Sequence, residues 1–232
     1  MPNELLLILS LIFTFSAVLV AFYIFQEQGL YLWTIIATIA ANIEALIVVN
    51  AFGMEMTLGN ILFASTFLVT DISSEIYGKK TAKKAVYLGI ATSVIFIPIS
   101  SSWLLYTPNA NDWAMPSIRT IFSNTPRLML VGIIVYVIVQ LFDVWAYHKW
   151  WAFTTKKFGD SKKFLWIRNN GSTLISQLMN TVLFTLGAFL GVYGVETLIS
   201  IMVSSYIIFV VTSVADTPFV YLARHIYEKK KS

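Results

Sequence analysis

Long apolar stretches alternate with short polar ones along the whole chain. A helix needs about 20 mostly apolar residues to cross the hydrocarbon core of a membrane. The stretches that reach this length are 4–26, 30–53, 57–78, 83–106, 127–150, 171–194 and 196–224. The pattern predicts an all-α, polytopic integral membrane protein, with about seven transmembrane helices in a single transmembrane domain over residues 1–232.

Two segments need separate interpretation. The first stretch begins Met-Pro-Asn-Glu without a basic segment, and its apolar part is too long for a signal peptide. We therefore expect it to be retained as a span. The segment 107–126 is polar and contains Pro108, Pro116 and Pro126. It is predicted to be an interfacial loop or short helix.

Composition agrees with a membrane protein and narrows the chemistry. Hydrophobic residues make up 57% of the chain and charged residues 12%, and the mean hydropathy is +0.74. Soluble domains carry about 25% charged residues, so no soluble domain is expected beyond short loops. The chain has no cysteine and two histidines. Disulfides and thiolate metal sites are excluded, and neither a metal nor a cofactor is expected.

The basic residues predict the orientation. Of the 16 lysines and arginines, 14 fall in the segments 79–84, 149–168 and 224–231. Seven spans place these segments on one side, and loops rich in Lys and Arg face the cytoplasm. The prediction is a cell-membrane protein with its N-terminus outside and its C-terminus in the cytoplasm. This placement explains the basic runs without nucleic-acid binding, which is not expected.

Carboxylates inside predicted spans are the main functional signal, because each costs a few kcal/mol to insert into a membrane. The chain carries Glu44, Asp71, Glu75, Asp143 and Asp216 within spans, with no basic residue expected at comparable depth. At about 1.5 Å per residue, the three aspartates lie ~10 to ~12 Å from the cytoplasmic ends of their helices. Carboxylates and amides from four helices at one level predict a binding cavity.

Helical spacing groups these polar residues into faces. Asp71 and Glu75 are four residues apart, and Gln177 and Asn180 share a face of the next-to-last span. The candidate substrate-binding residues are Asn42, Asp71, Glu75, Asp143, Gln177, Asn180 and Asp216, and Gln140 lies at the edge of this site. The alternative is that some of these side chains only hold helices together through hydrogen bonds. No catalytic residue is expected, since nucleophile-elbow, HExxH and P-loop motifs are absent.

Small residues indicate close helix packing. Gly187 and Gly191 form a GxxxG step, which favours packing either within the subunit or across a homodimer. Ala37, Ala41 and Ala45 form a small-residue face on the second span. Such a face could dock a partner, although it is common in any helix packing.

Several segments together resemble the queuosine precursor transporter family, also called the vitamin uptake transporter family, from about residue 30 to 226. They are LGNILFASTFLVTDISSEIYGKKTAKKAV (58–86), FDVWAYHKWW (142–151), FLWIRNNGSTLISQLMNT (164–181) and ADTPFVYLAR (215–224). The resemblance implies import of 7-deazaguanines such as preQ0 and preQ1, or queuine in some members, for tRNA modification. It also implies a six-span core, to which the first span here is an addition.

The resemblance makes Arg168, Asn169 and Asn170 candidates for the site or its gate; the alternative is helix capping with an interfacial anchor before the sixth span. The carboxylates suit the implied 7-deazapurine, whose N1–H and 2-amino group are donors. Another function remains open: a membrane-embedded binding subunit for a vitamin or purine that depends on an energy-coupling partner, like the S-components of vitamin importers.

Overall fold

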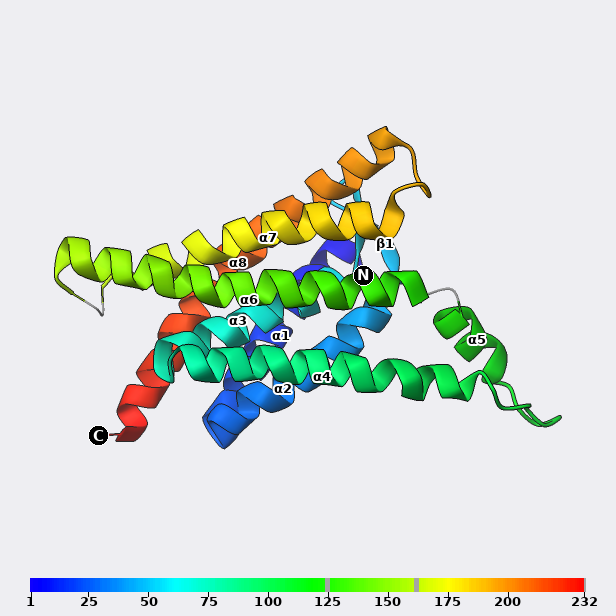
Figure 1. Cartoon of the computed structure of the whole chain (residues 1–232), viewed down its shortest axis with the longest axis horizontal. Helices are drawn as coiled ribbons and strands as arrows, with labels where there is room; N and C mark the ends of the chain where they lie inside the picture. The colour runs from blue at the N-terminus through cyan, green and yellow to red at the C-terminus, as the bar shows by residue number, and fades with distance from the viewer. Residues whose placement is uncertain (124–125, 161–162, 232) are drawn as a thin grey trace.

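The computed structural model is an elongated bundle of long helices that lie side by side (Figure 1). It describes residues 1–123, 126–160 and 163–231, without the side chains of Glu55 and of residues 123–129. Lys162, one of the 14 clustered basic residues, and the side chain of Arg127, one of the two basic residues outside those segments, lie outside this described part.

The described elements are α1 (Asn3–Phe25), α2 (Glu27–Glu44), β1 (Val48–Ala51), β2 (Met54–Thr57), α3 (Gly59–Ile76), α4 (Lys79–Trp103), α5 (Met115–Ser123), α6 (Pro126–Phe158), α7 (Leu165–Phe189) and α8 (Val195–Lys231). Within the described part, α1, α4, α6, α7 and α8 are long and apolar enough to cross a membrane. The chain is therefore a helical multi-pass membrane protein. The helices α2 and α3 have 18 residues each, about 27 Å, slightly less than a hydrocarbon core of about 30 Å.

A β-hairpin separates α2 from α3, so the predicted span 30–53 is wrong in its second half. The helix ends at Glu44, and β1 pairs antiparallel with β2 from Val48↔Thr57 to Ala51↔Met54. The turn is Phe52-Gly53, with φ of +53° and +72°, the left-handed conformation that two-residue hairpin turns require. A short apolar run rich in β-branched residues fits a strand as well as a helix, which is why the prediction failed here.

Several helix ends lie outside the apolar windows, whereas α4 and α7 end earlier than predicted, at Trp103 and Phe189. Helix α6 continues to Phe158, and α7 begins at Leu165, six residues before the predicted span. Helical hydrogen bonding continues beyond the apolar stretch, and the lysines in the last turns of α6 and α8 suit the negative ends of those helix dipoles. The short helix expected within 107–126 is confirmed as α5.

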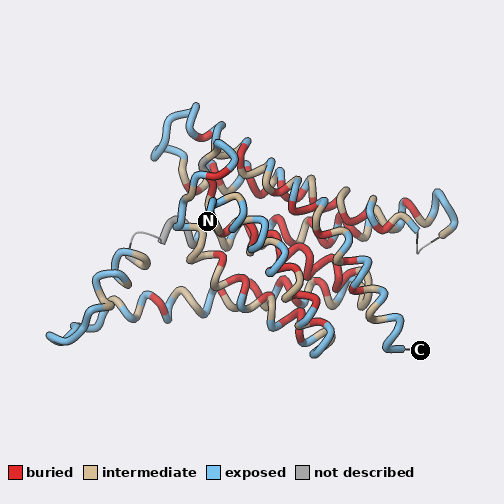
Figure 2. Tube along the Cα trace, turned by 180° about the vertical axis from the view of Figure 1, so that it is seen from behind, coloured by how far each residue is buried: buried red, intermediate tan, exposed pale blue. Residues whose placement is uncertain are grey.

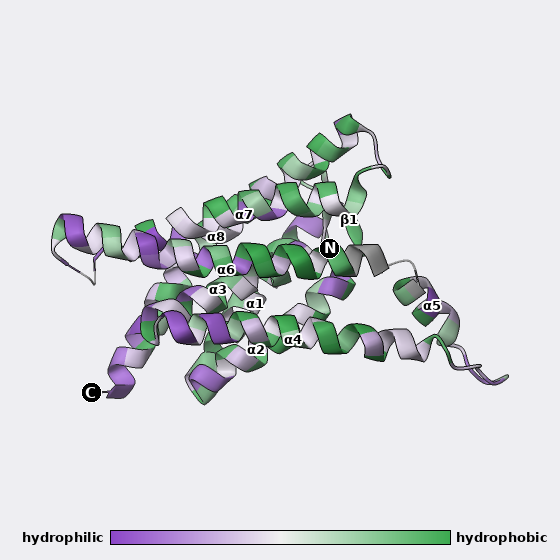
Figure 3. Cartoon of the chain, viewed as in Figure 1, coloured by the Kyte–Doolittle hydropathy of each residue, from purple (hydrophilic) through white to green (hydrophobic). Residues whose placement is uncertain are grey.

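The three basic segments gather at one end of the bundle. Hydrophilic residues colour the start of α4, the end of α6 and the C-terminus, all at the same end in Figure 3. Contacts confirm this proximity: the rings of Tyr77 and Tyr227 lie 5.4 Å apart, and Arg168 reaches Glu75. We call this the basic end of the bundle.

Helix α3 lies at the centre of the bundle. It packs against α1, α2, α4, α6 and α8, and most of its residues are buried. A helix enclosed by other helices has little contact with lipid, so it can carry polar residues that a lipid-facing helix could not. This position accounts for the threonines, serines and carboxylates in its sequence.

The first helix is an integral part of the core. Phe15, Val18 and Phe22 of α1 are fully buried in one cluster with residues of α2, α3 and α8. The ring of Phe15 meets that of Phe219 edge-on at 5.4 Å. A single residue, Gln26, joins α1 to α2, so the two helices form a tight antiparallel hairpin.

Close approach of helices explains two glycines. A Cβ on Gly29 would lie 2.0 Å from the Ala21 carbonyl oxygen, and one on Gly187 would lie 2.7 Å from Val131 Cγ1. Gly187 therefore serves packing of α7 against α6 within the subunit. Gly191 has a φ of +81° and follows the end of α7, so the predicted GxxxG step does not lie on one helix.

Replacing Gly29 with alanine is expected to destabilise the protein by about 1–3 kcal/mol, because the new methyl group meets backbone that cannot move aside easily. Thermal unfolding of the purified protein in detergent measures the effect. Gly132→Ala is the matched control, since its Cβ would meet nothing closer than Asn42 Oδ1 at 3.6 Å. Equal melting temperatures for the two variants would contradict the close packing of α1 on α2.

Candidate functional site

One face of α7 is polar along most of its length and is nevertheless buried. The buried residues on this helix include Arg168, Asn169, Ser172, Thr173, Ser176, Gln177, Asn180, Thr181 and Thr185. Their spacing follows the helical period, so they form a single stripe that faces the other helices. Figure 2 shows the buried residues concentrated in the middle of the bundle. Buried polar groups require partners, and α7 finds them on three neighbouring helices.

Three fully or nearly fully buried aspartates meet this stripe, each from a different helix. Thr173 Oγ1 donates to Asp71 Oδ2 at 3.2 Å on α3. Ser176 Oγ donates to Asp143 Oδ1 at 2.8 Å on α6. Asn169 Nδ2 donates to Asp216 Oδ1 at 2.7 Å on α8. We call the three aspartates and these three donors the polar centre. The structure thus brings Asp71, Asp143 and Asp216 to the same face of α7, spread over about two helical turns from Asn169 to Ser176.

Asn169 and Asn170 lie within the first turns of α7 and join it to α8. Asn170 Nδ2 donates to Thr217 Oγ1 at 2.7 Å, and Ser213 Oγ donates to Asn170 Oδ1 at 3.3 Å. The N-cap residue is Phe164, whose side chain makes no capping hydrogen bond. The capping interpretation of these asparagines is therefore wrong, because the helix begins earlier than the apolar window indicated.

Glu75 and Arg168 form a buried ion pair one helical turn from Asp71, toward the basic end. Arg168 Nε donates to Glu75 Oε2 at 2.9 Å, and Nη2 lies 2.7 Å from both carboxylate oxygens. The exposed fractions of the two side chains are 0% for Arg168 and 3% for Glu75. The expectation that no basic residue lies at the depth of these carboxylates is wrong for Glu75.

Two further side chains complete this ion pair. Tyr147 Oη donates to Glu75 Oε2 at 2.8 Å, and Arg224 Nη1 lies 3.3 Å from Glu75 Oε1. Arg168 also stacks on Trp151, with its guanidinium carbon 4.4 Å from the ring centroid. Glu75 is thereby saturated by protein groups from α6, α7 and α8, whereas the three aspartates bond to neutral donors.

The predicted amides lie one layer further from the basic end. Gln140 is fully buried, and its Nε2 donates to Thr66 Oγ1 at 2.6 Å. Gln177 and Asn180 are buried on the α7 stripe. Within the described part of the chain, Gln140 Oε1 and Gln177 Oε1 have no hydrogen-bond partner.

An aromatic cluster lies next to this amide layer. The ring of Phe63 lies 5.5 Å from Phe67, 6.2 Å from Tyr136 and 6.1 Å from Phe209. Phe63 is three residues from Thr66, the partner of Gln140. The sequence alone does not indicate which of its many aromatic residues face inward. The ring contacts identify these four as one aromatic cluster inside the bundle.

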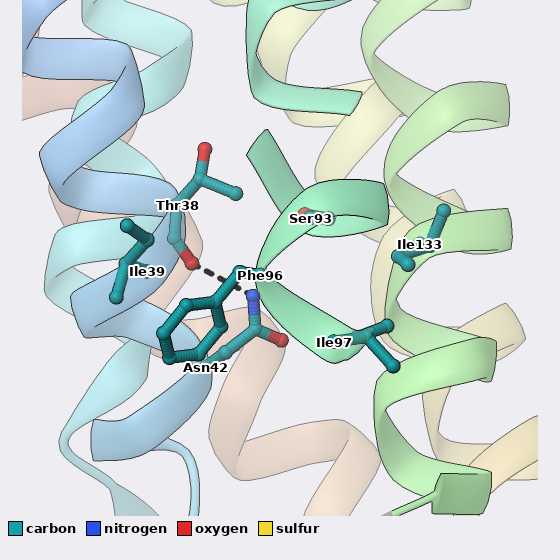
Figure 4. A pocket seen from close by; sticks show the side chains of 7 residues that line it. All are labelled: Thr38, Ile39, Asn42, Ser93, Phe96, Ile97 and Ile133. Carbon is teal, nitrogen blue, oxygen red and sulfur yellow. Dashed lines mark hydrogen bonds between the residues drawn. The ribbon is translucent and has the colours of Figure 1, made fainter. Parts of the chain in front are cut away.

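Asn42 is separate from the polar centre. It lines a small pocket with Thr38, Ile39, Ser93, Phe96, Ile97 and Ile133 between α2, α4 and α6 (Figure 4). Its Nδ2 donates to the Thr38 carbonyl oxygen of its own helix at 2.7 Å. The structure therefore does not bring Asn42 together with the aspartates, and the pocket is largely apolar.

Sequence reasoning missed Ser176, Tyr147 as a partner of Glu75, and the pairing of Arg168 with Glu75. Ser176 lies at i+4 from Ser172 and between Thr173 and Asn180, so the helical period carries a signal for it. The ion pair has no such signal, because it joins residues 93 positions apart.

An apolar helical bundle with carboxylates and amides buried against one face of α7 is the architecture of a multi-pass membrane protein with a polar interior. Comparison with known protein families identifies the family to which the chain belongs. Residues 57–223 match the family described as "Putative vitamin uptake transporter". The chain belongs to this family, whose members are transporters and not enzymes.

A curated relative supports this assignment. The chain is 34% identical over 210 residues to the "Probable queuosine precursor transporter" of Bacillus subtilis (strain 168). The alignment covers 90% of each protein. No solved structure matches the chain significantly. The first two helices lie outside the family match, although α1 contributes to the core.

Proposed function

We propose that this protein imports 7-deazaguanine precursors of queuosine, such as preQ0, preQ1 or queuine, and that the polar centre binds the base. The observation that carries the proposal is the meeting of three buried aspartates, from α3, α6 and α8, on one polar stripe of α7. A carboxylate can accept two parallel hydrogen bonds from N1–H and the 2-amino group of a deazaguanine. The name of the Bacillus subtilis relative points to the same substrate class.

The amides and aromatic residues suit the rest of such a base. Gln177 and Asn180 supply carboxamides on the same stripe of α7 that bonds the aspartates. An amide can donate a hydrogen bond to a ring carbonyl. Phe63, Phe67 and Tyr136 offer rings on which a planar base could stack. Asn42 takes no part in this proposed site, and Glu75 belongs to its boundary.

Uptake by the purified protein in liposomes tests the function. We expect labelled preQ1 to accumulate, and unlabelled preQ0 or queuine to compete while biotin does not. Competition by biotin alone would contradict the proposed substrate class. Guanine, which lacks the substituent at the 7-position, shows how much that substituent contributes to binding.

The Glu75–Arg168 pair is proposed as the cytoplasmic gate. It lies between the polar centre and the basic end, and it ties α3 to α7 and, through Arg224, to α8. Arg168 and Asn169 are consecutive, so the helix turn that holds Glu75 also holds Asp216. A base that displaces Asn169 from Asp216 would thereby strain the ion pair, which links binding to opening.

We propose that α2 and α3 also cross the membrane, giving seven spans in one domain, with the basic end in the cytoplasm and the N-terminus outside. Support comes from their position within the bundle and from the 14 basic residues whose sequence positions cluster near that end. Neighbouring helices bury most of α3, which compensates for its polar residues, whereas α2 buries one face and exposes the apolar Leu32 and Ile36 on the other.

Cysteine labelling tests the orientation, and the chain offers a clean background because it has no cysteine. We expect a membrane-impermeant maleimide to label Asn109→Cys, between α4 and α5, in intact cells. Lys163→Cys, whose side chain is 73% exposed beside α7, should react only after permeabilisation. Labelling of Lys163→Cys in intact cells would reverse the proposed orientation.

The alternative of a binding subunit with an energy-coupling partner loses its structural support. Ala37 and Ala41 are buried inside the chain, and a Cβ on Gly59 of α3 would lie 2.7 Å from the Ala41 carbonyl oxygen. The small-residue face of α2 therefore packs α3. Transport by the purified protein alone would exclude the alternative, whereas binding without transport would favour it.

A further inference from the structure

In the part of the chain that the structure describes, the buried polar atoms without a partner near the polar centre are carboxylate and carboxamide oxygens, which only accept, and the hydroxyls of Ser73, Ser74 and Thr181, which can donate or accept. In the described part of the chain, the buried oxygens without a hydrogen-bond partner include Asp71 Oδ1, Asp143 Oδ2, Gln140 Oε1, Asn169 Oδ1 and Gln177 Oε1. These residues are 0–1% exposed. A buried acceptor without a donor is costly, so the ligand that complements this site carries several N–H donors.

Gln177 gives this conclusion a basis independent of the acidic residues. It follows Ser176, which bonds Asp143, and lies one turn from Thr173, which bonds Asp71. Its carbonyl oxygen is therefore on the stripe that faces both carboxylates and has no donor of its own. Because Gln177 carries no charge, repulsion among the aspartates does not explain why its oxygen is unpaired. This oxygen instead indicates a ligand that donates a hydrogen bond.

Among the described residues, no basic side chain is bonded to the three aspartates of the polar centre. Asp71 lies within electrostatic range of Asp143 and Asp216, and also of Glu75. On the facing helices, Arg168 is held by Glu75, and Arg224 is shared between Glu75 and Glu228. The three aspartates accept hydrogen bonds from a threonine, a serine and an asparagine. Burying charge without a counter-charge is strongly unfavourable.

We infer that the polar centre requires one positive charge with its substrate, which arrives either as an ammonium group on the base or as a proton held by the aspartates when the base is neutral. The inference rests on the proposed function. A base with an aminomethyl group, such as preQ1, brings its own charge beside Asp71 and Asp143. A base with a neutral nitrile, such as preQ0, leaves the aspartates to hold one more proton.

Counting protons during binding distinguishes the two sources of charge. Calorimetric titration of the purified protein in two buffers of different ionisation enthalpy gives the number of protons exchanged for each base. We expect binding of preQ0 to take up about one proton more than binding of preQ1 at the same pH. This difference does not depend on how many aspartates are protonated beforehand. Equal proton exchange for the two bases would overturn the inference.

Substitution provides a second measurement. Asp143→Asn removes one negative charge and is expected to shift the ratio of preQ1 affinity to preQ0 affinity toward preQ0 by about tenfold. Glu44→Gln, the same change on α2 outside the polar centre, should leave the ratio unchanged. An unchanged ratio in Asp143→Asn would also overturn the inference. If wild-type protein bound neither base, the proposed substrate itself would be wrong, which is a distinct outcome.

Discussion

Asparagine in place of Asp71, Asp143 or Asp216 is expected to lower affinity for a 7-deazaguanine by about tenfold to a hundredfold. Removing a buried, ligand-paired carboxylate leaves donors on the base unpaired, at about 1–3 kcal/mol. The substitution keeps the volume and one acceptor, so it tests electrostatics more than packing. Binding to purified variants measures the effect, after surface expression has been confirmed.

The three positions should not behave alike. Asp71 and Asp143 each have an unpaired oxygen. Substitution at these two positions is therefore expected to lower the affinity for the base most. Asp216 also holds Asn169, and its substitution should impair transport more than binding. Wild-type binding by all three variants would show that the aspartates are structural. Glu44→Gln again serves as the control for carboxylate loss outside the centre.

Replacing Glu75 with glutamine is expected to cost about 3–5 kcal/mol of stability, because it leaves the buried Arg168 guanidinium without a counter-charge. The melting temperature in detergent and the amount of protein in the membrane should both fall. The exchanged pair, Glu75→Arg with Arg168→Glu, should recover part of the loss. Recovery would show that the charges act on each other and not merely as separate packing groups.

Glu228→Gln is the matched control for this experiment. Glu228 pairs with Arg224 at 3.4 Å, but its side chain is 52% exposed. Exposed ion pairs contribute about 0–1 kcal/mol, so this variant should melt close to wild type. If Glu75→Gln were as stable as Glu228→Gln, the pair would not hold α3 and α7 together.

Most of the helical framework and the position of the aspartates inside their helices were predictable from the sequence. Apolar length predicts helices, and a constant rise per residue places Asp71, Asp143 and Asp216 several residues inside the ends of theirs. The helical period also placed Gln177 on one face of its helix with Asn180. These properties are local, since they depend only on residues within a few turns of one another.

The partners of those residues were not predictable in the same way. Depth alone does not determine which helices are neighbours, so nothing in the sequence assigned Thr173 to Asp71 or separated Asn42 from the aspartates. The polar start of α7 looked like a loop, which hid Arg168 as a buried partner for Glu75. The hairpin was missed because Val48 and Val49 extend an apolar run that a strand and a helix share.

The central position of α3 also has a consequence for how the protein is made. A short helix that carries Asp71 and Glu75 is a poor candidate for entering the bilayer alone, since each carboxylate disfavours insertion by a few kcal/mol. Its partners Tyr147, Arg168 and Arg224 lie 72 to 149 residues further along the chain. We expect α3 to stay close to the insertion machinery, paired with α2 through the hairpin, until the later helices emerge. Biogenesis would then proceed in two stages, with the transport site completed last.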